Sequence, residues 1–223
     1  RFMSQMIRIS ANEYVHIKDL NENIAKLIVG SQLLVLKDHE RVINGPVKMV
    51  HIPPWNYCVI WNPAVRDDKG EVIMTSFGEP KVKFGEIEIR THEQWSEPFP
   101  LQIYEILEQD NQPYWTIPHD SALRIECIRH FIDPKTKEER FPGDEWLIYG
   151  PGTFIPRIEE RVVAVEKSVI IKQNHALQVR ARKNFIDWNG NPRVAGETWN
   201  ITKTGSYFLD VYEEHVTILK AFI

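Results

Sequence analysis

The strongest constraint on the fold is that this chain repeats itself. Four segments follow one template: an isoleucine, Tyr or Ala five residues later, Val, Cys or Leu at six, and Ile or Val at eight. The leading isoleucines are Ile9, Ile52, Ile117 and Ile171, so the steps are 43, 65 and 54 residues. Self-similarity at such a period is typical of tandem arrays of small structural units. The sequence therefore predicts repeats of about 54 residues.

Each template is followed in phase by a polar turn sequence. These turns begin at Asp19, Arg66, Asp133 and Asp187, and each predicts a hairpin loop. In the last of them the pair Asn189-Gly190 suits two residues at positive φ. The turns support the same four-fold division of the chain.

The intervening runs are rich in Val, Ile, Tyr, Phe and Thr, and no window of helical length keeps a helical period. Fourteen prolines and eleven glycines are spread through the chain and indicate many turns. We predict an all-β fold, a tandem array of small antiparallel β-sheet repeat domains. The predicted ranges are a tail or expression remnant at 1–5, repeats at 6–50, 51–112, 113–167 and 168–221, and the start of a truncated fifth repeat at 222–223.

The stretch "FPGDEWLIYGPGTFIP" looks at first like an active site, because Asp144 and Glu145 are adjacent carboxylates. Adjacent residues of a strand point to opposite faces, however, so the two could not easily flank one substrate. The segment also aligns with one 53 residues later, where Glu197-Thr198 retains a single carboxylate. We therefore interpret the pair as structural.

The same alignment bears on the aromatic and glycine residues of this stretch. Trp146 matches Trp199, and a tryptophan that recurs at the period of the array predicts a buried core side chain rather than a ligand platform. Gly150-Pro151-Gly152 lacks the Gly-Lys-Ser/Thr ending of a phosphate loop. Because only its last glycine has a counterpart, Gly205, we predict a turn residue at positive φ.

No residues form a recognisable catalytic, cofactor or metal motif. The "DWNGN" turn resembles the start of a calcium loop, but its twelfth position is Thr198 and its glycine is fourth rather than sixth, so a hairpin is the better interpretation. The eight histidines form no zinc signature. The prediction is a protein that is not an enzyme, with no catalytic, cofactor-binding or metal-binding residues.

The composition bears on nucleic-acid binding and on the cellular compartment. The formal charge of −4 with interspersed signs gives no basic stripe for nucleic acid. Two cysteines are too few for a disulfide framework, and neither a membrane-spanning run nor a secretory signal is present. These features favour a reducing compartment, so we expect a cytoplasmic protein, with the nucleus as a further location.

Several longer motifs resemble those of the major vault protein family. They are "VHIPPWNYCVIWNPAVRD", "EPFPLQIYEIL", "GDEWLIYGPGTFIPRIEE", "IIKQNHALQVRARKNFID" and "YEEHVTIL", in the order of that family's amino-terminal repeats. The resemblance implies a structural shell protein whose copies pack side by side into the wall and waist of the vault ribonucleoprotein particle, with this chain as a fragment. The implied partners are further copies of itself, and in the whole particle vault poly(ADP-ribose) polymerase, telomerase-associated protein and vault RNA.

A second function class remains open on the residues alone. Small open sheets leave edge strands whose unpaired N–H and C=O groups are used for association or must be covered. The alternative is therefore a monomeric β-repeat scaffold that binds partner proteins on its sheet edges and loops. The two hypotheses differ in size, since a shell protein forms very large symmetric particles by head-to-tail contacts that close a ring.

Overall fold

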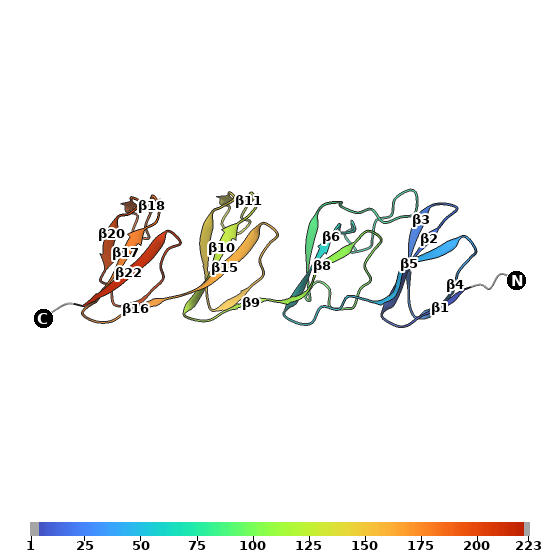
Figure 1. Cartoon of the computed structure of the whole chain (residues 1–223), viewed down its shortest axis with the longest axis horizontal. Coiled ribbons are helices and arrows are strands. Elements are labelled where there is room, and N and C mark those ends of the chain that lie inside the picture. The colour runs from blue at the N-terminus through green and yellow to red at the C-terminus, as the bar shows by residue number, and fades with distance from the viewer. Residues whose placement is uncertain (1–4, 221–223) are drawn as a thin grey trace. The chain divides into compact units, whose positions relative to one another are not determined.

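The structure is a computed structural model that describes residues 5–220. It contains strands and turns, without a helix among these residues, and thus confirms the predicted all-β class (Figure 1). No helix with the length and apolar character needed to cross a membrane occurs in the part described. The predicted start of a fifth repeat at 222–223, and all of the predicted tail except Gln5, lie outside the described residues.

The later positions of each template lie in the central strand of a three-stranded antiparallel sheet. A strand further along the repeat pairs on one side of it, and the strand that ends the repeat pairs on the other. The four sheets are β3 (Ile24–Val29), β2 (Glu13–Asp19) and β5 (Glu40–Lys48); β7 (Ile87–Thr91), β6 (Asn56–Trp61) and β8 (Ile106–Pro113); β13 (Glu145–Tyr149), β10 (Ser121–Cys127) and β15 (Glu160–Lys167); β20 (Thr198–Ile201), β17 (His175–Ala181) and β22 (Glu213–Lys220).

A smaller two-stranded element completes each repeat and carries the leading isoleucine or lies beside it. In the second repeat this element is reduced to one bridge between Val50 and Phe99. In the others it is β1 (Met6–Ile9) with β4 (Gln32–Val35), β9 (Trp115–Ile117) with β14 (Gly152–Phe154), and β16 (Val169–Ile171) with β21 (Gly205–Tyr207).

The apolar template positions form four separate cores, one in each repeat. In the third repeat Ile117, Leu123 and Ile125 are all at most 2% exposed and form one cluster, which joins β9 to β10. Leu123 and Ile125 face the same side because side chains alternate along a strand. The corresponding residues of the other repeats form equivalent clusters, so the periodic pattern in the sequence marks the cores directly.

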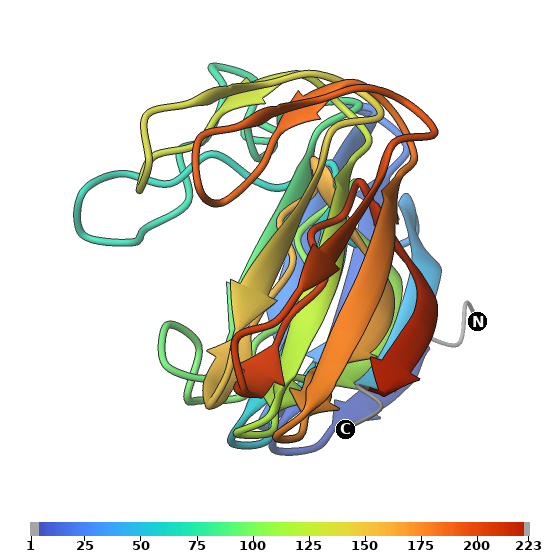
Figure 2. The same cartoon turned by 90° about the vertical axis from the view of Figure 1, so that its left-hand side faces the viewer.

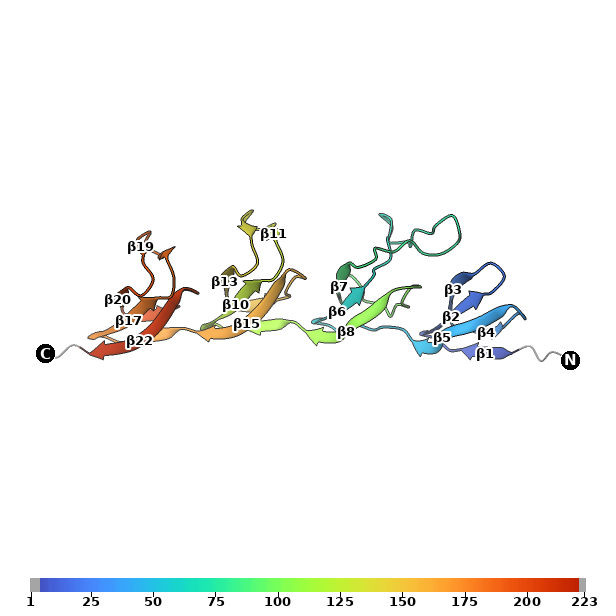
Figure 3. The same cartoon turned by 45° about the horizontal axis from the view of Figure 1, so that its top comes forward.

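The unequal steps of the sequence arise from what connects the central strand to its neighbour. The first repeat has only a short turn between β2 and β3. The third and fourth insert small hairpins, β11 (Phe131–Ile132) with β12 (Glu139–Arg140) and β18 (Phe185–Ile186) with β19 (Pro192–Arg193), which rise from their sheets in Figure 3. The second inserts residues 63–86, held by bridges such as Ala64 to Val82. The step is short after the first repeat and long after the second for this reason.

The contacts divide the chain into two compact units, with the division between Tyr114 and Trp115. Each unit contains two of the three-stranded sheets. Within the second unit, the inserted hairpin of the fourth repeat lies at the upper end of its sheet in Figure 2. Strand β8 runs to Pro113, one residue past the predicted limit of the second repeat; the exact repeat boundaries stay a prediction.

Two predictions about turn conformation were partly wrong. Gly190 has a φ of 82°, but Asn189 is not at positive φ, because Asp187 accepts the amides of Asn189 and Asn191 and so closes a different turn. Gly205 has a φ of 124°, whereas Gly152 is not at positive φ and lies in strand β14.

Candidate functional site

The carboxylates of the stretch 141–156 have separate structural partners. Asp144 accepts the amide of Phe141 at 2.8 Å and closes the turn before β13. Glu145, in β13, pairs with Arg124 of β10, whose Nε lies 2.7 Å from Glu145 Oε2. Glu197, the counterpart of Asp144, accepts the amide of Val194 in the same way at 3.0 Å. The shared carboxylate thus closes a repeated turn, in agreement with the structural interpretation.

Trp146 and Trp199 pack against the cores of their repeats, as predicted. Both side chains are only partly buried, however, whereas the sequence predicted buried ones. The outer face of each indole is covered by an arginine of the inserted hairpin instead. The guanidinium carbon of Arg140 lies 4.6 Å from the Trp146 ring centroid, and that of Arg193 lies 4.2 Å from the Trp199 centroid. The sequence predicted the core contact of each tryptophan but not the cation–π contact with an arginine.

A buried glutamate closes the turn before the last strand of every repeat. In the fourth repeat Glu213 is 3% exposed, accepts the amide of Asp210 at 3.1 Å, and accepts the Tyr207 hydroxyl at 2.9 Å. Burial raises the pKa of the Glu213 carboxyl and also that of Glu160. The amide of the residue three positions earlier is likewise accepted by Glu40, Glu105 and Glu160.

The "DWNGN" loop uses its aspartate internally, which supports the hairpin interpretation. Asp187 Oδ1 accepts the amides of Asn189 and Asn191, both at 2.9 Å, while Oδ2 accepts Arg193 Nε at 2.8 Å. Burial opposes ionisation of Asp187, but these hydrogen bonds outweigh it and lower its pKa. The ionised carboxylate therefore already has a cation beside it, which disfavours a calcium ion at this loop.

One group of side chains in the first repeat has the composition of a metal site. Oxygen and nitrogen atoms of Asp19, His39 and Glu40 lie within 4.8 Å of one another. Asp19 Oδ1 already accepts two turn amides, Glu40 closes its own turn, and the ammonium of Lys26 lies 3.8 Å from Asp19 Oδ2. A neighbouring cation makes the group better suited to holding the turn than to binding metal.

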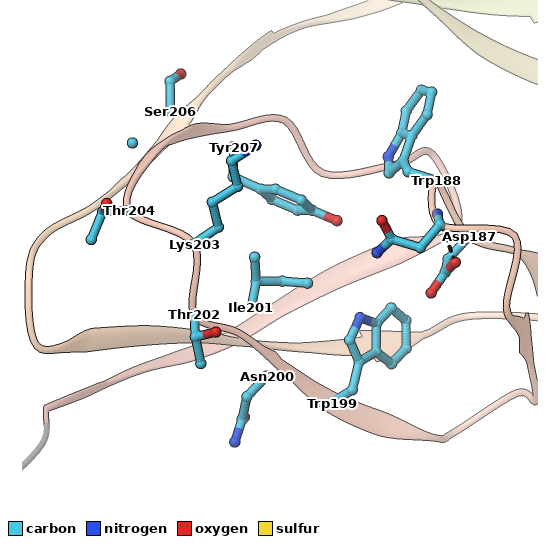
Figure 4. A pocket seen from close by; sticks show the side chains of 12 residues that line it. Asp187, Trp188, Trp199, Asn200, Ile201, Thr202, Lys203, Thr204, Ser206 and Tyr207 are labelled. Carbon is cyan, nitrogen blue, oxygen red and sulfur yellow. Dashed lines mark hydrogen bonds between the residues drawn. The ribbon is translucent and has the colours of Figure 1, made fainter.

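The fourth repeat contains an open cavity of about 500 Å³ between its inserted hairpin and the loop from β20 to β21. Figure 4 shows the rings of Trp188, Trp199 and Tyr207 around it, with Ile201 between them. No pair of carboxylates and no nucleophile with an adjacent base lines it. The cavity offers aromatic and amide surface, which is suited to contact rather than chemistry.

Within each unit, the same template position contacts the next repeat. His16 and Arg124 both lie seven residues after the leading isoleucine of their repeat. His16 Nε2 donates to the carbonyl of Leu101 at 2.8 Å, and Arg124 Nη2 donates to that of Val211 at 3.4 Å. Burial lowers the pKa of His16, so the neutral tautomer with hydrogen on Nε2 makes this bond.

Further contacts support both junctions. In the first unit Glu79, from the insertion of the second repeat, accepts the amide of Ala25 at 2.9 Å. In the second unit the Tyr149 ring lies 5.1 Å from that of Phe208 and 6.3 Å from that of Trp188. The sequence reasoning missed these junction residues, although a polar residue between two core positions of a repeating template was the signal available.

The last strand of each three-stranded sheet is paired on one side only among the described residues. These last strands also expose apolar side chains. In β15, Val163 and Val165 are exposed: Val165 lies opposite the buried Leu123 of β10, and Val163 lies at a shift in the strand register. Exposed apolar residues of the other last strands are Ile43, Ile106, Ile218 and Leu219. Open strand edges with exposed apolar side chains are suited to lateral association.

Comparison with known proteins gives a consistent result. Residues 49–110 match a family model described as the Major Vault Protein repeat domain, and residues 116–157 and 169–210 match a second model with the same description. The matched segments cover most of the second, third and fourth predicted repeats.

The chain is also similar to longer proteins that are named major vault proteins. The chain is 41% identical over 220 residues to the major vault protein of Danio rerio, covering 99% of this chain and 25% of that protein. It is 40% identical to major vault protein beta of Dictyostelium discoideum, over 99% of this chain and 26% of that protein. It is 39% identical to the human major vault protein, over 98% of this chain and 24% of that protein. The chain spans about a quarter of the length of these relatives.

Proposed function

The chain belongs to the major vault protein family, and on this premise we propose that it forms part of the wall and waist of the vault particle, a hollow shell in which many copies pack side by side. In this role the four repeats supply β-sheet segments of the wall, and the chemistry is association rather than catalysis. Copies contact one another head to tail around a ring, because an isologous contact would stop at a dimer.

The observation that carries the proposal is identity of about 40% across nearly the whole chain to proteins of this family. The open strand edges support it physically. Each repeat is too small to bury all its apolar surface, and the exposed Val165 of β15 recurs in β22 as Ile218, each opposite a buried leucine of the central strand. A surface that recurs along the chain suits a neighbour with the same period, which a parallel copy provides.

Electron microscopy of the natural polypeptide that contains this sequence tests the proposal. Large closed particles are the expected result, and the double variant Val163→Lys, Val165→Lys should reduce their number because it places charges on the exposed edge strand β15. Lys135→Ala, an exposed change in a hairpin loop, serves as the matched control. Monomers alone at high concentration would instead favour the scaffold that binds partners on its edges.

Family membership extends the proposal to the cellular location and to binding partners. We expect the particle in the cytoplasm with a nuclear fraction, and we expect vault poly(ADP-ribose) polymerase, telomerase-associated protein and vault RNA to bind the assembled particle. Co-sedimentation of each with intact particles, and not with particles disrupted by the β15 variant, is the result that supports this extension. Cell fractionation checks the location.

A further inference from the structure

Trp55 occupies a backbone conformation that its side chain disfavours. It lies in the turn before β6 with a φ of 62°, in the left-handed region that bulky residues rarely adopt. The equivalent turns of the first and fourth repeats place Asn12 and Asn174 there, each with a φ of 60°. Asparagine tolerates this conformation because its short side chain bonds locally. The second repeat therefore keeps a tryptophan at a position suited to asparagine.

Burial does not compensate for this conformation, because 65% of Trp55 is exposed. An unfavourable backbone conformation that brings no core contact points to a role in binding. The position is also well fixed: the Asn56 amide bonds to the Pro53 carbonyl at 3.2 Å, and the Tyr114 amide bonds to the Trp55 carbonyl at 2.9 Å. The indole is thus exposed on a rigid turn.

Trp55 belongs to an aromatic shelf, which we define as Trp55, Tyr114 and Tyr57. The Trp55 ring lies 6.1 Å from the Tyr114 ring at 87°, and Tyr114 stacks on Tyr57 at 6.3 Å and 28°. The Tyr114 hydroxyl donates to Glu93, which fixes a carboxylate beside the shelf. This hydrogen bond lowers the pKa of Glu93, so the carboxylate is ionised at neutral pH.

The surroundings of the shelf are acidic. Strand β8, which ends beside it, has exposed Glu108 and Asp110 and no basic residue. The nearby His92 directs Nδ1 at the Ile52 carbonyl, 2.7 Å away. Aromatic faces and a carboxylate together attract cations, through the ring quadrupole and the net charge.

The same chain shows which cation its tryptophans bind. Trp95, Trp146 and Trp199 each have an arginine guanidinium over the ring, at centroid distances of 4.2 to 4.7 Å. No cation lies over Trp55 among the described residues. We propose that the aromatic shelf with Glu93 is a docking site for an arginine side chain of a protein partner, whose guanidinium stacks on Trp55.

Trp55 itself lies on a turn of the second repeat rather than on a last strand, so its substitution leaves the open strand edges unchanged. Its open form suits a side chain presented on an extended peptide, since no enclosed cavity is needed to stack a planar guanidinium. Arginine is preferred to lysine because its planar group stacks on an aromatic face and is more weakly hydrated.

The test follows the indole N–H resonances of the intact chain by NMR during titration with the peptide acetyl-Gly-Arg-Gly-amide. The Trp55 resonance, assigned by its loss in Trp55→Asn, should shift saturably. Acetyl-Gly-citrulline-Gly-amide, which has the same shape without the charge, should leave it unchanged. Equal shifts with both peptides would overturn the proposal, and equal affinity for a lysine peptide would overturn the choice of arginine.

Two variants separate binding from folding. Trp55→Asn introduces the residue of the sister repeats, so the thermal midpoint should stay or rise while affinity for the arginine peptide falls about fivefold, as for one lost cation–π contact. Trp188→Asn, at a tryptophan that is 58% exposed, is the control and should leave affinity unchanged. A marked fall in the midpoint of Trp55→Asn, or equal loss of affinity in both variants, contradicts the docking site.

Discussion

Replacing Gly150 by alanine should destabilise the third repeat severely. A Cβ atom at Gly150 would lie 2.2 Å from the carbonyl oxygen of Pro118 and 2.9 Å from that of Ile117. These are backbone atoms, which cannot rotate away, and the first distance is more than an ångström short of ordinary contact. The approach exists because the Gly150 amide donates to the Ser121 carbonyl at 3.0 Å, which holds the β13–β14 loop against the start of β10.

The magnitude follows from two terms. Overpacking of a well-packed site costs about 1–3 kcal/mol, and weakening one buried hydrogen bond adds about 1 kcal/mol. The expected loss is therefore about 3 kcal/mol, or a fall of roughly 13 °C in the thermal midpoint for a unit of this size. Gly30 faces the same constraint in the first repeat, because its Cβ would lie 1.9 Å from the Ser10 carbonyl oxygen.

Gly152 is the matched control, two residues further along the chain at the start of β14. It is not at positive φ, and no heavy atom lies within 4 Å of its virtual Cβ. Gly152→Ala should therefore change stability by less than about 1 kcal/mol and could increase it, because alanine restricts the unfolded chain. The amide signals of β10 during thermal unfolding report on this repeat alone. Similar midpoints for the two variants would refute the steric reasoning.

Three further changes test the repeated features. Trp146→Ala should lower the free energy of unfolding in urea by about 2–3 kcal/mol, less than for a fully buried tryptophan. Arg140→Ala should lower it by about 0.5–1 kcal/mol. A larger loss for the arginine variant than for the tryptophan variant would contradict the partly buried position of Trp146. Because burial raises the pKa of Glu213, the folded carboxyl binds its proton more tightly than the unfolded one, so its contribution to stability is full below the unfolded value of 4.5 and is lost as pH rises. Glu213→Gln should therefore gain stability relative to the parent between about pH 4 and pH 8, and a constant difference across that range would contradict this assignment. Calcium should give no saturable heat in titration calorimetry, since Arg193 already neutralises Asp187.

The cores were the most predictable part of the fold. Leu123 and Ile125 share one face of β10 at the spacing that the strand period imposes, and Ile117 of β9 packs in the same cluster. Backbone conformation was less predictable. Gly152 and Gly205 match in the alignment but differ in φ, since the shape of a loop depends on what it packs against. The strained Trp55 was also invisible, because a tryptophan beside two prolines carries no sequence signal for a left-handed turn.

The surface contacts were likewise predictable only in part. Trp146 was correctly placed on the core, but the stacking of Arg140 required the path of the inserted hairpin, which the sequence does not specify. The buried glutamates had a visible signal, since Glu160 and Glu213 match at the repeat period. Their function in closing a turn was not visible, because a glutamate in a strand-rich segment usually faces solvent.

The junction hydrogen bonds of His16 and Arg124 have a consequence for how such arrays diverge. Each side chain donates to a backbone carbonyl, at Leu101 and at Val211, and every residue provides this acceptor. The receiving repeat can therefore change its side chains freely while the joint persists. Only the donor position is constrained, and two chemically different residues, His16 and Arg124, act as the donor. Neighbouring repeats can thus drift apart in sequence, and exchange of one repeat for another need preserve only the path of the receiving turn.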